Sequence, residues 1–150
     1  MLDRLELGGG AEGWGSTRGQ LVIRHPAPGV VVFVEKGFLT SEFAAHIVDH
    51  CDRALDEALK VEVFVDGYDL DGYDPEIRNG ASDWLRRNSA RVIAQHMLVR
   101  SRLTKMGLSV VSLAFGGLIR GHHERRSFDA DLAVAIRRAR SGRMGSSAQL

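Results

Sequence analysis

Acidic and aromatic side chains capable of chemistry gather in one segment, residues 61–85, which reads VEVFVDGYDLDGYDPEIRNGASDWL. Six acids and two tyrosines, but no Lys or Arg, occur within residues 61–77. An Asp can cap free backbone N–H groups and proline fits the first helical position, so Asp74 and Pro75 predict a helix start. The loop between a strand and a helix is where α/β proteins place functional residues. We therefore expect the function to depend on this acidic loop, residues 66–76.

Two known chemistries use a motif like Asp69-Leu70-Asp71-Gly72. Calcium loops place carboxylates at alternate positions around a glycine turn. Aligning Gly72 with that glycine puts Gly67 at the first ligand position and Arg78 at the glutamate position, so this is not an EF-hand. Phosphate-transferring hydrolases also carry DxDG after a strand, but their lysine and later acidic pair have no counterpart here. A solvated turn, rich in Asp and Gly because both suit turns, is the simplest interpretation, and partner recognition is the second.

Two histidines, His46 and His50, are spaced as in zinc-binding helices, where residues i and i+4 reach one ion. The apolar face of this predicted helix is already taken by Phe43, Ile47 and Cys51. We therefore expect the histidines on a solvated polar face without zinc, and Cys51 as a buried, inert thiol. Two further histidines, at positions 25 and 96 in predicted strands, are interpreted as packing or hydrogen-bonded residues.

Arginines dominate the C-terminal part of the chain, with seven of them against three acids in residues 120–143. Such a patch is typical of anion or nucleic-acid binding. However, arginines near the end of a helix also favour the helix dipole, and no interleaved aromatic residues supply base stacking. We therefore do not expect nucleic-acid binding.

Composition restricts the broad class of protein. The chain has 150 residues, 44% of them hydrophobic, which fits one globular domain. Its net charge of +1 produces no overall electrostatic field that would attract nucleic acid or a membrane surface. The single Cys51 allows no internal disulfide and suits a reducing compartment. The N-terminus lacks the pattern of a signal peptide, and the apolar run 106–119 is too short to span a bilayer. We expect a cytoplasmic domain without membrane insertion.

Hydrophobic periodicity divides the chain into a glycine-rich flexible arm (1–19), a domain (20–140) and a flexible tail (141–150). The expected order is β-β-α-β-α-β-α-β-α, an α/β fold with a mixed sheet of about five strands and helices mainly on one face. The expected strands are 21–25, 30–35, 61–65, 92–99 and 108–115, and the helices are 41–60, 75 onward, a single turn at 100–106, and 127–140.

This order and the central loop resemble the STAS domain, the fold of bacterial anti-sigma-factor antagonists. In that family a strand ends in Asp, an apolar residue follows four positions on, and a second Asp four further precedes a phosphorylatable Ser or Thr. Asp66, Leu70 and Asp74 match this pattern, whereas Pro75 and Glu76 stand where the hydroxyl should be. The resemblance implies a STAS-like regulatory domain over residues 20–140. The departure implies that phosphorylation at the usual position does not switch it, since Glu76 supplies a permanent negative charge.

These observations predict a non-enzymatic protein–protein interaction or signalling module, without catalytic residues, cofactor or metal. Its partner would be another protein with a basic surface, because tyrosines supply contact area and acids supply steering. Two alternatives remain: a small-ligand-binding or enzymatic domain with a pocket beside Asp66, or a structural subunit of a homo-oligomer. A deep apolar cavity would favour ligand binding and a filled core would favour the interaction module. The predicted partner-binding residues are Tyr68, Asp71, Tyr73, Asp74 and Glu76.

Overall fold

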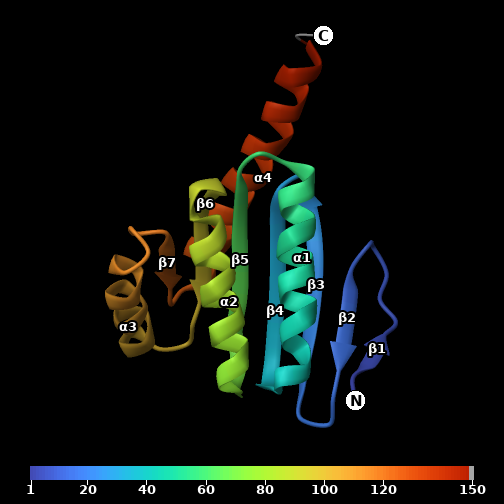
Figure 1. Ribbon diagram of the computed structural model, residues 1–150, viewed down its shortest axis with the longest axis vertical. Helices are drawn as coiled ribbons and strands as arrows, with labels where there is room; N and C mark the ends of the chain where they lie inside the picture. Colours follow the sequence, from blue (N-terminus) through green and yellow to red (C-terminus); the bar gives the residue numbers. More distant parts are fainter. Residues whose placement is uncertain (149–150) are drawn as a thin grey trace.

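The computed structural model describes the backbone of residues 1–148 and the side chains of residues 1–142. Within this part of the chain, seven strands form one sheet in which the sequence order is also the spatial order (Figure 1). The first four strands pair antiparallel, and the last four pair parallel. The strands are β1 (Asp3–Leu5), β2 (Glu12–Gly15), β3 (Gly19–Ala27), β4 (Val30–Leu39), β5 (Val61–Tyr73), β6 (Val92–Leu98) and β7 (Ile119–His122).

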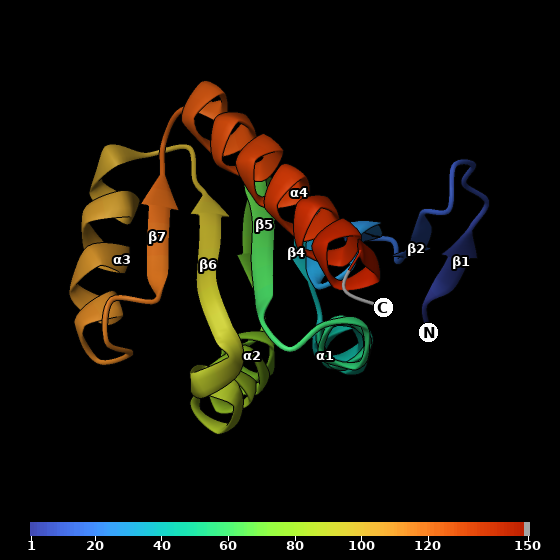
Figure 2. The same cartoon turned by 90° about the horizontal axis from the view of Figure 1, so that it is seen from above.

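Helices cover both faces of the sheet. Figure 2 shows α1 and α2 on one face, α4 across the opposite face, and α3 beside β7 at the edge. The helices are α1 (Ala44–Glu57), α2 (Pro75–Asn88), α3 (Arg102–Leu113) and α4 (Arg125–Ala148), with short 3-10 turns η1 (Ser41–Phe43) and η2 (Ser89–Arg91). Residues 61–66 of β5 are all buried, as expected for a central parallel strand with helices on both sides.

The hydrophobic core therefore has two parts, one on each face of the sheet. One part lies between the sheet and α1 and α2, and includes Phe33, Phe43 and Trp84. The other lies between the sheet and α4, and is built around Phe64 and Phe128, whose rings meet edge to face at 5.6 Å. Because side chains alternate along a strand, neighbouring residues of β4, β5 and β6 face different halves of this core.

The predicted α/β class is confirmed, but the expected sheet of about five strands is wrong. The order is β-β-β-β-α-β-α-β-α-β-α, and α4 covers the face opposite α1 and α2, so the helices are not confined to one face. The hairpin of β3 and β4 and the start of α2 at Pro75 are as predicted.

Two of the additional strands, β1 and β2, lie in the glycine-rich segment 1–19. Glycine in this segment allows neighbouring side chains to pack close to the backbone. A Cβ added at Gly13 would lie only 2.7 Å from Leu7 Cδ1. Similarly, α4 continues through Ala148, beyond the expected end at residue 140. The domain boundaries and the mobility of the arm and tail remain predictions, and residues 149–150 of the tail lie outside the described residues.

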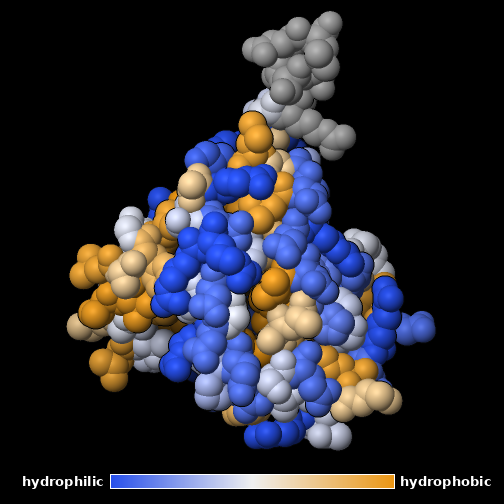
Figure 3. All heavy atoms as spheres, viewed as in Figure 1, coloured by the Kyte–Doolittle hydropathy of each residue, from blue (hydrophilic) through white to orange (hydrophobic). Residues whose placement is uncertain are grey.

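The region after β6 differs most from the expectation. The predicted single turn at 100–106 and strand at 108–115 are replaced by α3, and the last strand is β7. Apolar side chains on α3 face solvent, as Figure 3 shows at the left, so their pattern does not mark a buried strand. The available signal was Ser101, whose hydroxyl accepts the Thr104 N–H at 3.1 Å and caps the helix. The exposed residues are Leu103, Met106, Val110, Val111 and Leu113.

No helix in the described part of the chain is long and apolar enough to cross a membrane.

Candidate functional site

The acidic segment is not the loop expected from the sequence. β5 continues as a strand to Tyr73, and its second half pairs with β4, where Lys36 lies opposite Asp69 and Leu39 opposite Tyr73. This pairing satisfies the backbone polar groups, which outweighs the turn preference of Asp and Gly.

The tertiary structure also brings cations to the acids. Arg125, from α4, binds Asp66 through two N–H···O contacts of 2.9 and 3.3 Å. Arg100 lies 3.8 Å from Asp69 and donates to the Tyr68 carbonyl at 2.7 Å. The absence of Lys and Arg from residues 61–77 therefore does not leave these carboxylates unopposed, because the arginines come from distant parts of the chain.

The five predicted partner-binding residues are divided by the sheet. Tyr68 and Tyr73 are 38% and 41% exposed. The Tyr68 ring lies 5.8 Å from the Arg125 guanidinium, on the α4 side, whereas Tyr73 lines a cavity beside α2. Asp71 and Glu76 are exposed. The group is therefore not one continuous surface on a single face.

Asp74 occupies the N-cap position of α2, but its side chain makes no hydrogen bond to that helix. Its Oδ2 atom instead accepts the Ser41 N–H at 2.8 Å, at the start of η1. The predicted capping of α2 by this side chain is thus wrong. The carboxylate joins the start of one helical segment to the start of another, 33 residues away in sequence.

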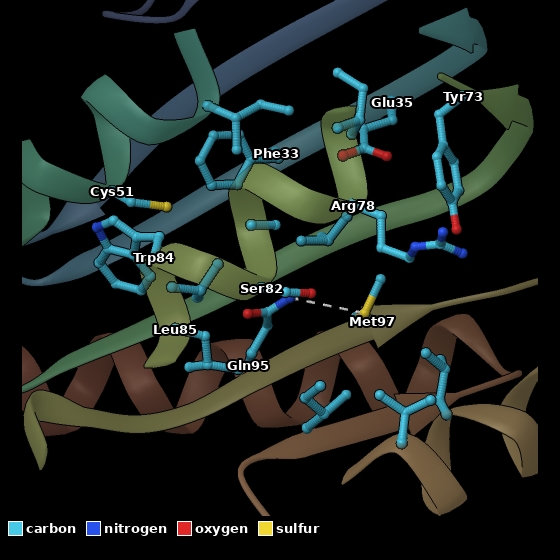
Figure 4. A pocket seen from close by; sticks show the side chains of 18 of the residues that line it. Phe33, Glu35, Cys51, Tyr73, Arg78, Ser82, Trp84, Leu85, Gln95 and Met97 are labelled. Carbon is cyan, nitrogen blue, oxygen red and sulfur yellow. Dashed lines mark hydrogen bonds between the residues drawn. The ribbon is translucent and has the colours of Figure 1, made fainter. Parts of the chain in front are cut away.

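A cavity of about 310 Å³ lies between the sheet and helices α2 and α3. Its wall is mainly apolar, and Glu35 of β4 is the one acid among its lining residues. Figure 4 shows Glu35, Tyr73 and Arg78 at one end and Trp84 at the other. Asp66 and histidine are absent from the lining, so the expected pocket beside Asp66 is displaced to the other side of β5.

Glu35 is only 7% exposed, and its side chain lines the cavity. Burial, assisted by the negative charge of Asp66, raises the pKa of Glu35 to about 7. The side chain therefore carries a titratable proton near neutral pH. Sequence reasoning missed it, although Val31, Phe33 and Glu35 alternate toward one face of the strand.

Cys51 also lines the cavity but is chemically quiet, as predicted. Burial raises the pKa of its thiol, so the sulfur keeps its proton and is a poor nucleophile.

The histidine pair of α1 is not on a solvated face. His46 stacks on Trp14 of β2, with ring centroids 3.8 Å apart, and His50 is only 1% exposed. His50 Nδ1 is hydrogen-bonded to His25 Nε2 at 2.8 Å. Burial and Arg53 lower the pKa of His50 to about 4, so this ring is neutral at physiological pH. The expectation failed because β2 covers this side of α1.

The other strand histidine, His96, is buried and hydrogen-bonded to Glu62 and His122, in agreement with its predicted role. The Arg-rich segment supplies ion pairs within the domain: Arg125 contacts Asp66, and Arg138 lies 3.6 Å from Glu62. The Ser127 hydroxyl, at the expected start of the last helix, is hydrogen-bonded to His122 Nδ1 at 2.8 Å.

No protein-family model matches the sequence, and no curated protein matches it. Among solved structures, the chain is similar to an uncharacterized protein of the DUF3478 family with a SpoIIAA-like fold, from Shewanella loihica PV-4. The superposition has a TM-score of 0.61 and 15% identity, and covers 76% of this chain and 94% of that chain. The fold is STAS-like. At this identity the similarity establishes the fold alone, and it confirms the resemblance drawn from the sequence.

Proposed function

We propose that this STAS-like domain is a non-enzymatic cytoplasmic regulatory module that binds a small amphipathic molecule in the cavity beside Glu35. The observation that carries the proposal is the buried carboxyl of Glu35 at one end of a mainly apolar cavity, beside Tyr73 and Arg78. A ligand that supplies a hydrogen-bond partner to this carboxyl would gain affinity from it.

The shape and lining of the cavity define the ligand class. The volume of about 310 Å³ lies at the lower end of the range for small-molecule sites, about 300–1,000 Å³. Trp84 and Leu85 lie at the end remote from Glu35, where they would hold an apolar body (Figure 4). At the other end, protonated Glu35, the Tyr73 hydroxyl and the Arg78 guanidinium are all hydrogen-bond donors. A monocarboxylate with a short apolar chain matches this arrangement.

Binding is favoured over catalysis because the cavity offers few reactive groups. Acid–base catalysis commonly pairs two titratable groups, and Glu35 is the one acid in the lining, while Cys51 is held as a protonated thiol.

The experiment is a titration with octanoate at pH 6, followed by the fluorescence of Trp84 in the Trp14→Phe background. Octanoate is expected to saturate the signal, and octylamine of the same chain length is expected to bind at least tenfold more weakly because Arg78 repels it. Ala81→Leu, which fills the cavity, should abolish binding. Asn79→Leu, an exposed neighbour on the same helix, should leave binding unchanged.

Equal binding of octanoate to wild type and Ala81→Leu would overturn the cavity as the site. Tighter binding of octylamine than of octanoate would overturn the carboxylate assignment and make ionised Glu35 the recognition group.

Partner recognition by the end of β5 is a second candidate, supported by the exposure of Tyr68, Asp71, Tyr73 and Glu76. Tyr73 belongs to both sites, so a ligand in the cavity would change the surface offered to a basic partner. Asp71→Lys and Tyr73→Ala should reduce capture of such a partner from cell extract, with Asp83→Lys as the exposed control on α2. Unchanged capture by both variants would place the partner surface elsewhere.

A further inference from the structure

Three potential metal ligands converge on the face of the sheet opposite the cavity. His96 comes from β6, His122 from β7 and Asp131 from α4. His96 Nδ1 lies 3.1 Å from His122 Nε2, and each of these nitrogens lies 3.5 Å from Asp131 Oδ2. The three donor atoms thus form a nearly regular triangle.

The dimensions of this triangle match one face of a metal coordination tetrahedron. Donors bound to Zn²⁺ at about 2.0–2.2 Å in tetrahedral geometry lie roughly 3.3–3.6 Å from one another. A single ion could therefore bind all three donor atoms with shifts of only a few tenths of an ångström.

The outer nitrogens of both imidazoles have the partners that metal-binding histidines require. His96 Nε2 lies 2.7 Å from Glu62 Oε2, and a carboxylate only accepts, so this nitrogen carries the proton. His122 Nδ1 lies 2.8 Å from the Ser127 hydroxyl, which can accept its proton. Such contacts fix the ring orientation and aim the inner lone pair at the metal.

Without a metal, the two inner nitrogens can hydrogen-bond to each other. With the proton of His96 on Nε2, its Nδ1 accepts the His122 Nε2–H at 3.1 Å, and the Ser127 hydroxyl donates to His122 Nδ1. A cation at the centre of the triangle would replace this hydrogen bond once the His122 proton moves to Nδ1, and it would also bind Asp131 Oδ2.

We propose that His96, His122 and Asp131 bind one divalent transition-metal ion of the zinc class. Two imidazoles and one carboxylate suit such an ion better than Ca²⁺ or Mg²⁺, which prefer oxygen ligands. The histidines are buried, while the Asp131 side chain is 44% exposed and gives access from solvent. The fourth position would be open to water or to an external ligand.

The experiment is calorimetric titration of the chelator-treated full chain with Zn²⁺. Wild type is expected to bind one ion per chain with micromolar or tighter affinity, and its melting temperature should rise with Zn²⁺ because only the folded state brings the ligands together. Asp131→Asn should weaken binding at least tenfold. Asp129→Asn, an exposed aspartate on the same helix, is the matched control and should bind as wild type.

A second variant tests the role of the outer partner. Glu62→Gln should weaken Zn²⁺ binding by about 10- to 100-fold, as is usual for partners of metal-bound histidines, while the metal-free protein stays folded by circular dichroism.

Two results would overturn the proposal. Equal Zn²⁺ affinity in wild type, Asp131→Asn and Glu62→Gln would show that zinc binds elsewhere. In that case, loss of Zn²⁺ binding in His25→Gln would locate the zinc site at the His25–His50 pair. Absence of stoichiometric binding to wild type would show that the triad is a hydrogen-bonded network alone.

Discussion

On the face of the sheet covered by α1 and α2, the buried acid Glu35 faces a mainly apolar cavity, whereas on the α4 face the buried acids Glu62 and Asp66 both contact nitrogen donors. All three come from the two central strands, β4 and β5. Burial alone therefore does not determine how an acid is accommodated. Opposing N–H groups and positive charge stabilise the acids below α4, while Glu35 avoids the cost of a buried charge by keeping its proton.

The strongest test of this contrast removes Glu62. Glu62→Ala should lower the free energy of unfolding by about 3 kcal/mol, because the buried His96 Nε2–H loses its acceptor. Glu62→Gln retains an acceptor oxygen and should cost roughly 1 kcal/mol. Urea unfolding of the metal-free proteins measures both values, and equal losses would show that the negative charge of Glu62, not its hydrogen-bond acceptor, is responsible.

Glu35→Gln should have the opposite effect on stability, and only at higher pH. The pKa of Glu35 rises from 4.5 to about 7 on folding, so the folded state binds the proton more tightly and stability falls as pH rises through this window. At pH 8 the variant should be more stable than wild type by about 2–3 kcal/mol, and at pH 4.5 the difference should be small. Thermal unfolding between pH 4.5 and 8 checks this, and a pH-independent difference would contradict it.

Arg125 should matter less, because half of its side chain is exposed to solvent. Arg125→Ala removes both contacts to Asp66 and should lower the free energy of unfolding by about 1–2 kcal/mol. Arg126→Ala is the matched control, since this neighbouring arginine is exposed. The two variants are compared by urea unfolding, and equal stabilities would mean that water replaces Arg125 at no cost.

The smallest effect is expected at Asp74. Asp74→Ala removes the acceptor of the Ser41 N–H and should cost about 1 kcal/mol. Amide hydrogen exchange provides the sharper measurement, because protection should fall at Ser41 and not at the start of α2. Loss of protection in α2 alone would restore the capping role expected from the sequence.

Much of the fold could be predicted because its signals are local. The alternating residues of β3 and β4, the periodic face of α1 and the Asp-Pro start of α2 depend on neighbours within a few positions. The failures occur where distant contacts override local preference. Glycine-rich residues become β1 and β2 because β1 pairs with β2 and β2 pairs with β3. The helix after Ser101 was missed for a different reason, because its apolar residues are exposed and were interpreted as a buried strand.

The candidate sites were less predictable, because each depends on residues far apart in sequence. Glu35 carries a signal in the alternation of its strand, but the cavity that it faces exists only once α2 and α3 cover the sheet. The triad joins His96 to His122, 26 residues on, through the parallel pairing of β6 and β7. No spacing rule connects these residues.

By itself, the sequence determined the α/β class, the central strands and the positions of α1 and α2, because hydrophobic periodicity and the Asp-Pro helix start act over a few residues. The resemblance to the STAS family, carried by element order and by Asp66, Leu70 and Asp74, indicated the STAS-like fold. Only the tertiary structure decided which charges meet. Arg125 binds Asp66 although the two residues are 59 positions apart in sequence, and the acidic segment forms a paired strand instead of a free loop. The physical reason is that electrostatic and hydrogen-bond energies depend on distance in space and on exposure to water, neither of which is encoded by proximity along the chain.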